Sequence, residues 1–331
     1  MGELSRWLGS DAGLGAWWDR QQPLGGSPVA LPEPTPEELL ELAVPHEDIG
    51  PLLTAAAAAG AEPAAGRLVE RCARLLRREV GTVGRPPLQL PVLPAALGPF
   101  ASYFPVLVHL AVLPATRAFH AERRIPAEVT RLTLTDLGRT MALHRRRYGQ
   151  GGMLHPYWLA HHVRGELYQL GRLQFQRARL GSRTGLAVAG AGAPYGPGSP
   201  CLGVHIPDFC GPLTPAACDR SVAWAREFFT RHFPAEYPAD RPTVATCHSW
   251  LLDPQLREYL PGDANLIRFQ RRFRPGYRPE EPEDTVAVDF VFGDPTLTLT
   301  ALPRRTTLER AIGDHLRAGR HWYGGNGWFE L

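Results

Sequence analysis

The sequence contains no lysine, and all 36 of its basic residues are arginine. Without lysine the chain can form no Schiff base with a carbonyl substrate and can anchor no pyridoxal phosphate. It also lacks the phosphate-binding lysine of a Walker motif. These three kinds of chemistry are therefore excluded.

Cysteine is also scarce, with five residues in 331. They are Cys72, Cys201, Cys210, Cys218 and Cys247, an odd number whose spacing matches no zinc pattern. The first 20 residues form an amphipathic run and lack the basic region and apolar core of a secretory signal. We therefore expect free thiols in a cytoplasmic protein, with no bound metal.

The net charge is only +3, which is too small for a typical nucleic-acid binder and fits a site for a small anion as well. One long apolar stretch, residues 88–113, is interrupted by Pro91, Pro94, Pro99 and Pro105. Since proline breaks helices, we interpret this stretch as packed, proline-broken helices rather than a membrane span.

The chain is long enough for two domains. Residues 1–124 read as a helical N-terminal domain, in which Thr35, Pro36 and Glu38 form the start of a helix. Residues 125–331 alternate between strands and helices, which predicts an α/β (α+β) domain with a mixed sheet flanked by helices. The strands are expected at 165–177, 201–206, 244–251, 265–273, 285–292 and 328–331, and the main helices at 215–232 and 308–318.

The second domain resembles the GNAT-like acyltransferases of actinobacteria, in which a helical N-terminal domain precedes a GNAT-like C-terminal domain. The residues that carry the resemblance are 164–175 (RGELYQLGRLQF), 205–207 (HIP), 247–254 (CHSWLLDP), 268–273 (RFQRRF) and 302–308 (LPRRTTL). The abundant arginine, with 34 glycines and 33 prolines, is typical of GC-rich coding in such organisms.

The resemblance implies direct transfer of an acyl group from a thioester, usually acyl-CoA, to a small-molecule amine. In the family, backbone groups of a splayed strand polarise the thioester, and this strand would end here at Ile206. The next helix receives the pyrophosphate at its N-terminus through a glycine-rich loop, which would contain Gly211 and Thr214. That loop has one glycine and two prolines, so it offers few backbone N–H groups, and another acyl carrier or none becomes credible.

His205 and His248 lie near the ends of strands that would be neighbours in this arrangement. Either imidazole is suited to deprotonate an incoming ammonium, because it titrates near neutral pH. Each is also consistent with a buried structural histidine. Tyr259 follows at the position where the family often places a tyrosine that protonates the leaving thiolate, but it fits an interfacial aromatic equally well.

Other candidates are binding residues. Trp250 shares a strand face with His248, either as a substrate wall or as core packing. Arg268 and Arg272 lie on the polar face of the expected strand 265–273, where they could bind a phosphate or simply face solvent. Glu166 is a further candidate for substrate contact, as a base with a raised pKa.

Two alternatives to an N-acyltransferase remain open. A hydrolase could use Cys247 or Ser249 with His248, but strand alternation turns His248 away from both neighbours. A non-catalytic module with the GNAT fold could bind a small ligand or a partner protein, as the poor phosphate loop suggests.

Overall fold

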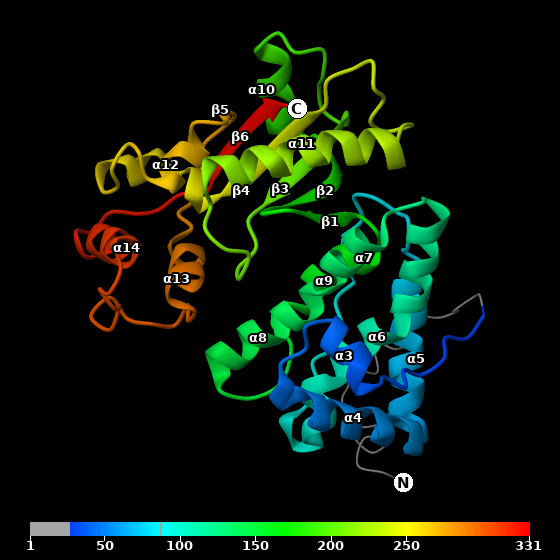
Figure 1. The fold of residues 1–331 in the computed structure, drawn as a ribbon. Helices are drawn as coiled ribbons and strands as arrows, with labels where there is room; N and C mark the ends of the chain where they lie inside the picture. Colours follow the sequence, from blue (N-terminus) through cyan, green and yellow to red (C-terminus); the bar gives the residue numbers. More distant parts are fainter. Residues whose placement is uncertain (1–26, 87) are drawn as a thin grey trace. The chain divides into compact units, whose positions relative to one another are not determined.

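A computed structural model describes residues 27–86 and 88–331, which divide into two compact units at the boundary between Tyr168 and Gln169. The amphipathic run expected at residues 1–20 lies outside the described residues. Each unit is described by itself below, with the element labels of Figure 1.

The N-terminal unit is helical. Its elements are α3 (Pro36–Glu41), α4 (His46–Ala61), α5 (Pro63–Arg77), η1 (Ala95–Leu97), α6 (Pro99–Glu122), α7 (Ala127–Leu134), α8 (Asp136–Tyr148) and α9 (Pro156–Val163). The predicted capping box is confirmed: the Thr35 hydroxyl accepts from the Glu38 N–H, and the Glu38 carboxylate accepts from the Thr35 N–H.

The long helix α6 corrects one expectation, because it continues through Pro105 and Pro114 instead of breaking. Its side chains from Tyr103 to Leu113 are mostly buried against α4, α5 and α9. This burial offsets the hydrogen bonds that the two prolines cannot donate. Two buried histidines, His109 and His120, belong to the same helix.

Among the described residues, α6 is the one helix whose length and apolar composition would allow it to cross a membrane. In the structure, 61% of that apolar window is buried. The buried central helix of a helical core passes the same test, so this property is weak evidence for a membrane span.

The division between the units lies after Tyr168 and not after residue 124, where the sequence placed it. Helices α7, α8 and α9 contribute to the core built by α4, α5 and α6, through Leu134 of α7, Leu137 and Met141 of α8, and Leu159 and Val163 of α9. These helices therefore belong to the first unit because their apolar faces are buried there.

The C-terminal unit is built on a six-stranded mixed sheet with the order β1-β2-β3-β4-β6-β5. The strands are β1 (Leu167–Leu170), β2 (Leu173–Arg179), β3 (Pro200–His205), β4 (Val244–Ser249), β5 (Arg274–Pro275) and β6 (Gly325–Glu330). β3 and β4 are parallel, while the pairs β2/β3, β4/β6 and β5/β6 are antiparallel. The predicted α/β class with a mixed sheet and flanking helices is confirmed.

Helices cover both faces of this sheet. α11 (Pro215–His232) crosses the strands on one face (Figure 1) and packs on β2. α10 (Ser182–Gly190) packs on β6 at the other face, where Val188 meets the buried Cys201, Val244 and Trp328. The remaining elements are η2 (Trp250–Leu252), η3 (Pro254–Glu258), α12 (Asn265–Gln270), α13 (Asp284–Phe292) and α14 (Thr307–Arg317).

Three predicted strands differ from the structure. Segment 165–177 contains two strands separated at Gly171, whose φ of +74° is the left-handed conformation that glycine accepts readily. Segment 265–273 begins with helix α12, and segment 285–292 lies within helix α13. The helices predicted at 215–232 and 308–318 are confirmed; Thr214 is the N-cap of the first, and Thr306 is the N-cap of the second, which begins at Thr307.

Candidate active site

The parallel strands β3 and β4 separate toward their carboxyl ends. Their paired positions are Leu202 with Ala245 and Gly203 with Thr246. β3 continues to His205 and β4 to Ser249 beyond that pairing, and both remain paired with their other neighbours. This splay is where an open α/β sheet collects ligands, because backbone groups at the strand ends lack their usual partners.

His205 and His248 point to the same face of the sheet at this splay. Gly203 and Thr246 are opposite each other, so they point to the same face of the sheet. Each histidine follows two residues later on its strand, and because side chains alternate between faces, both histidines point to that face too. The row continues with Gln174 and Gln176 on β2 and with Asn326 on β6. A polar strip therefore crosses the splay on the α10 face.

The His205 ring is held by a neighbouring strand. Its Nε2 lies 2.9 Å from the Gln176 Oε1 atom. Because an amide oxygen only accepts, Nε2 carries the ring proton and Nδ1 is the basic nitrogen. Gly203 leaves room for this ring, since a Cβ atom there would lie 3.2 Å from Nε2.

His248 has a carboxylate neighbour. Its Nε2 is 3.5 Å from Oε1 of Glu283, and the His248 side chain is 49% exposed. The negative charge of a carboxylate attracts a bound cation such as an ammonium. His248 and Glu283 thus form a cation-favouring end of the polar strip.

The N-terminus of α11 lies just after β3 and is flanked by two arginines. Thr214 caps the helix by accepting from the Ala217 N–H. An Nη atom of Arg172 donates to the Pro207 carbonyl, and Arg272 pairs with Asp219 at 2.7 Å and donates to the Pro215 carbonyl at 3.0 Å. Burial lowers the pKa of Arg172, and both arginines keep a buried Nε that has no hydrogen-bond partner.

The loop before α11 has an uncommon backbone. Gly211 adopts φ +76° and Phe209 adopts φ +60°, a conformation that costs energy for a residue with a side chain. Phe209 is 61% exposed. Ile206 directly follows β3 and is half-buried. Arg268 is exposed on α12, so the predicted arginine face of a strand does not exist, and Arg272 alone reaches α11.

Cys247 and Ser249 do not join the histidines. Cys247 is 2% exposed on the opposite sheet face, and burial raises the pKa of its thiol to about 12. The Ser249 hydroxyl accepts from the Leu251 N–H at the start of η2. This geometry disfavours a nucleophilic dyad in segment 247–249.

Three further candidates lie elsewhere. Tyr259 places its hydroxyl 2.9 Å from Nδ1 of the buried His315. Trp250 is 5% exposed within an apolar cluster that includes Leu256 and Ile312. Glu166 belongs to the N-terminal unit, where it is buried and pairs with Arg164. Tyr259 packs against the same apolar cluster as Trp250, and neither belongs to the row of polar residues that contains His205 and His248.

Sequence patterns missed the residues that orient the histidines. Gln176 and Glu283 are 29 and 35 residues from their partners, and only strand register and the course of segment 276–283 bring them together. Arg172 follows Gly171 in the turn between β1 and β2. The glycine was a usable signal for that turn. Among the described residues, no group of three or more His, Cys, Asp or Glu side chains could hold a metal ion.

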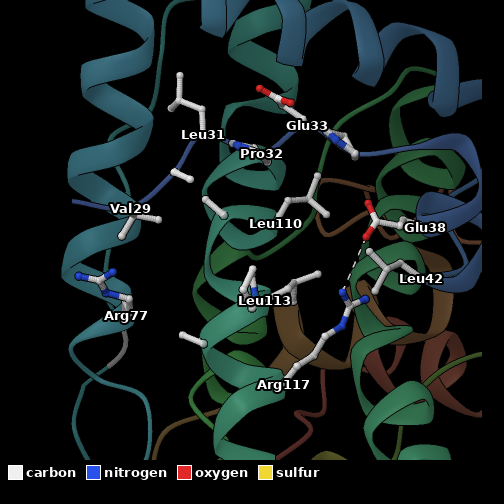
Figure 2. Close-up of a pocket in the computed structure, with 15 residues that line it drawn as sticks. Val29, Leu31, Pro32, Glu33, Glu38, Leu42, Arg77, Leu110, Leu113 and Arg117 are labelled. Atoms are coloured by element: carbon white, nitrogen blue, oxygen red, sulfur yellow. Dashed lines mark ion pairs between the residues drawn. The ribbon is translucent and has the colours of Figure 1, made fainter. Parts of the chain in front are cut away.

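The N-terminal unit contains a separate pocket of about 360 Å³. Figure 2 shows Val29, Leu31, Leu110 and Leu113 lining it, with an ion pair between Arg117 and Glu38 at 3.9 Å. Arg77 donates to the backbone carbonyls of Ser27 and Pro28 beside it. The lining is mainly aliphatic and offers no imidazole as a general base.

Comparisons with known proteins match both parts of the chain. Residues 167–329 match the family described as GNAT-like C-terminal domain, and residues 33–165 match the N-acyltransferase N-terminal domain. No curated protein is similar enough to match the chain.

Solved structures of acyltransferases align with nearly the whole chain. An acyltransferase in complex with decanoyl-CoA and teicoplanin is 41% identical, with a TM-score of 0.87 over 99% of this chain and 98% of that chain. An acyltransferase in complex with CoA and 10C-teicoplanin is 40% identical, with the same TM-score and coverage. A tryptophan-to-alanine mutant acyltransferase in complex with octanoyl-CoA also has 40% identity, a TM-score of 0.87 and that coverage.

Proposed function

The chain belongs to the acyltransferase family that joins an N-acyltransferase N-terminal domain to a GNAT-like C-terminal domain, and we propose that it transfers a medium-length acyl group from CoA to an amine. The octanoyl-CoA and decanoyl-CoA complexes of its relatives support the donor. The observation that carries the proposal is the splay of β3 and β4 with His205 and His248 on one face.

In this proposal the thioester lies in the splay. Backbone N–H groups near Val204 and Ile206 polarise its carbonyl and stabilise the oxyanion that forms on attack. Pairing between β3 and β4 extends only as far as Gly203 and Thr246, which supports the availability of the backbone N–H groups beyond it.

The diphosphate of CoA is assigned to the N-terminus of α11. Loop 206–214 offers few amides, so the guanidinium groups of Arg172 and Arg272 replace part of the usual glycine-rich loop. Both arginines already contact backbone carbonyls beside that helix end. Arginine binds phosphate oxygens through paired N–H donors, and the helix dipole adds to the attraction.

His205 is the proposed general base. Its Nδ1 accepts a proton from the acceptor ammonium, and the neutral amine then attacks the thioester carbonyl. The resulting tetrahedral intermediate collapses, the C–S bond breaks, and the CoA thiolate leaves and takes up a proton. The pair of His248 and Glu283 favours the positive charge of the ammonium before it loses that proton.

The experiment is an assay with decanoyl-CoA and an amine acceptor, with teicoplanin as the first acceptor tried. CoA release is measured with a thiol reagent, and the product is identified by mass spectrometry before and after hydroxylamine treatment. An amide survives hydroxylamine, whereas an ester does not. A hydroxylamine-sensitive product would contradict the amine acceptor while leaving acyl transfer intact.

A matched binding experiment separates the donor site from the chemistry. We expect the pair of variants Arg172→Gln and Arg272→Gln to raise KM for decanoyl-CoA about tenfold each, as the loss of a charged hydrogen bond implies. Arg231→Gln, on the exposed part of α11 and paired with Glu227, is the control. Unchanged KM values in both variants would contradict the assignment of the diphosphate to α11.

A further inference from the structure

Three exposed arginines lie over aromatic rings near one edge of the sheet. The Arg183 guanidinium carbon is 5.5 Å from the Tyr277 ring centroid, Arg274 is 5.1 Å from that of Trp328, and Arg278 is 4.1 Å from that of Tyr323. Within residues 27–86 and 88–331, none of the three has a carboxylate partner at ion-pair distance. Their positive charges are therefore positioned by stacking and are not neutralised.

These arginines border the polar strip through Asn326. Asn326 is opposite His248 in the sheet, and its side-chain oxygen accepts from the Thr184 hydroxyl at 3.3 Å, next to Arg183. Its carbonyl accepts from the Gly276 N–H, and Tyr277 and Arg278 come directly after that glycine. The two residues approach closely here, because a Cβ atom at Gly276 would meet the Asn326 side-chain oxygen and displace it.

Arg274 reaches the same face by strand register. It is opposite Trp328 on β6, and Trp328 is opposite Thr246, two residues before His248. Residues opposite each other in a sheet point to the same side. Arg183, Arg274 and Arg278, which we name the arginine rim, thus lie on three different segments around one end of the polar strip.

A negative side chain and the positive arginine rim lie at the same end of the polar strip. Glu283 faces His248 and favours a cation, whereas the arginine rim favours an anion. We propose that the acceptor carries a carboxylate besides its amine, and that the arginine rim binds this carboxylate while the amine lies between His205 and His248. This inference rests on the proposed function and narrows its acceptor to amphoteric compounds such as peptides with a free carboxyl group.

Calorimetric binding tests the inference. The probes are teicoplanin, which has both an amine and a carboxylate, and teicoplanin whose carboxylate has been converted to an amide. The protein is saturated with CoA, so that acyl transfer does not interfere. The carboxylate form is expected to bind about tenfold more tightly than the amide, the loss typical of one charge-assisted contact.

Variants then locate the contact. Arg183→Gln combined with Arg278→Gln is expected to remove the difference between the two probes, while Arg231→Gln on α11 preserves it. Circular dichroism and the KM for decanoyl-CoA show whether the fold and the donor site are intact. Equal affinities of the two probes for the unchanged protein, or no binding of either, overturn the inference, and so does a double variant that raises only the KM for decanoyl-CoA.

The result of this binding experiment can be distinguished from the result of the acyl-transfer assay. Failure to form an amide product refutes N-acylation but leaves a measured preference for the carboxylate probe intact. Conversely, amide formation with no preference for the carboxylate refutes the arginine rim and leaves N-acylation standing.

Discussion

His205 and Gln176 face each other across two antiparallel strands, with the imidazole Nε2 2.9 Å from the amide oxygen. Gln176 is opposite Gly203 and Gln174 is opposite His205, so the Gln176 side chain reaches diagonally along the same sheet face. One neutral hydrogen bond therefore fixes both the orientation of the ring and the nitrogen that carries its proton.

The first prediction concerns this base. His205→Gln is expected to lower kcat about 10²- to 10⁴-fold, the usual contribution of a general base, with little change in KM for decanoyl-CoA. Gln176→Leu is expected to lower kcat less, because the ring remains but loses its preferred tautomer. Steady-state kinetics measure both. His46→Gln, an exposed histidine of α4, controls for the loss of any imidazole, and normal kcat in His205→Gln would assign the base elsewhere.

The second prediction concerns the space beside that ring. Gly203→Ala places a methyl group 3.2 Å from His205 Nε2 and 3.5 Å from Gln176, which displaces the hydrogen-bonded pair by a few tenths of an ångström. We expect a clear fall in kcat with a cooperative thermal unfolding transition retained. Gly181→Ala, where nothing lies within 4 Å of the added Cβ, is the matched control. Equal kcat in the two variants would show that the ring position is unimportant.

A third prediction separates acyl transfer from thiol catalysis. Cys247→Ala is expected to keep kcat near that of the unchanged protein, because the thiol is buried and its pKa is raised to about 12. The variant should lose about 1 kcal/mol of unfolding free energy through the small cavity it creates. A fall in kcat of a hundredfold or more, together with labelling of Cys247 by decanoyl-CoA, would restore the hydrolase-like dyad.

The fourth prediction is a pH dependence of stability. Burial lowers the pKa of both His109 and His120 to about 4 from an ordinary 6.5. In the unfolded chain these histidines bind protons as pH falls below about 6.5, whereas in the folded chain they stay neutral until about pH 4. Their stabilising contribution is thus complete above pH 6.5 and is lost progressively down to about pH 4.

Urea unfolding at several pH values measures this loss. Between pH 6.5 and pH 4, each histidine is expected to lower the unfolding free energy by up to about 3 kcal/mol, since one pKa unit corresponds to about 1.4 kcal/mol. His120→Phe is expected to reduce the slope of unfolding free energy against pH across this window. A slope equal to that of the unchanged protein would mean that His120 is protonated in the folded state or is accessible to water.

Local motifs with a specific mechanism were predicted well from the sequence. The capping box predicted from Thr35 and Glu38 is confirmed. The helices predicted at 215–232 and 308–318 also begin at threonine N-caps, Thr214 and Thr306. In each case the signal is a hydrogen bond between residues three positions apart, which no distant contact can change.

Short apolar segments were predicted less well, because their pattern fits two periods. Segment 265–270 alternates Ile267 and Phe269 with polar residues, yet Ile267 and Gln270 are both buried, as the period of a helix requires. Segment 284–292 is rich in valine, but Gly293 at φ +77° ends it as a helix. Packing against distant residues decided between the strand period and the helix period, and such contacts cannot be read from a short segment of sequence.

The candidate site shows the same limit. His205 and His248 were predicted as candidates because each lies near a strand end, and the structure places both near the ends of β3 and β4. Their partners Gln176 and Glu283 depend on register between β2 and β3 and on the path of segment 276–283. Arg272 was predicted on the polar face of a strand, but it lies just beyond helix α12.

The boundary between the two units falls inside strand β1, after Tyr168. The chain therefore has no linker at which a cloning boundary could be drawn. A protein expressed from Gln169 onward would begin in mid-strand, with the outer strand of the sheet cut in half and β2 left as an exposed edge. If such a shortened protein aggregated, the exposed edge of β2 would explain it. The result would not show whether the acyl-transfer site needs the helices before it.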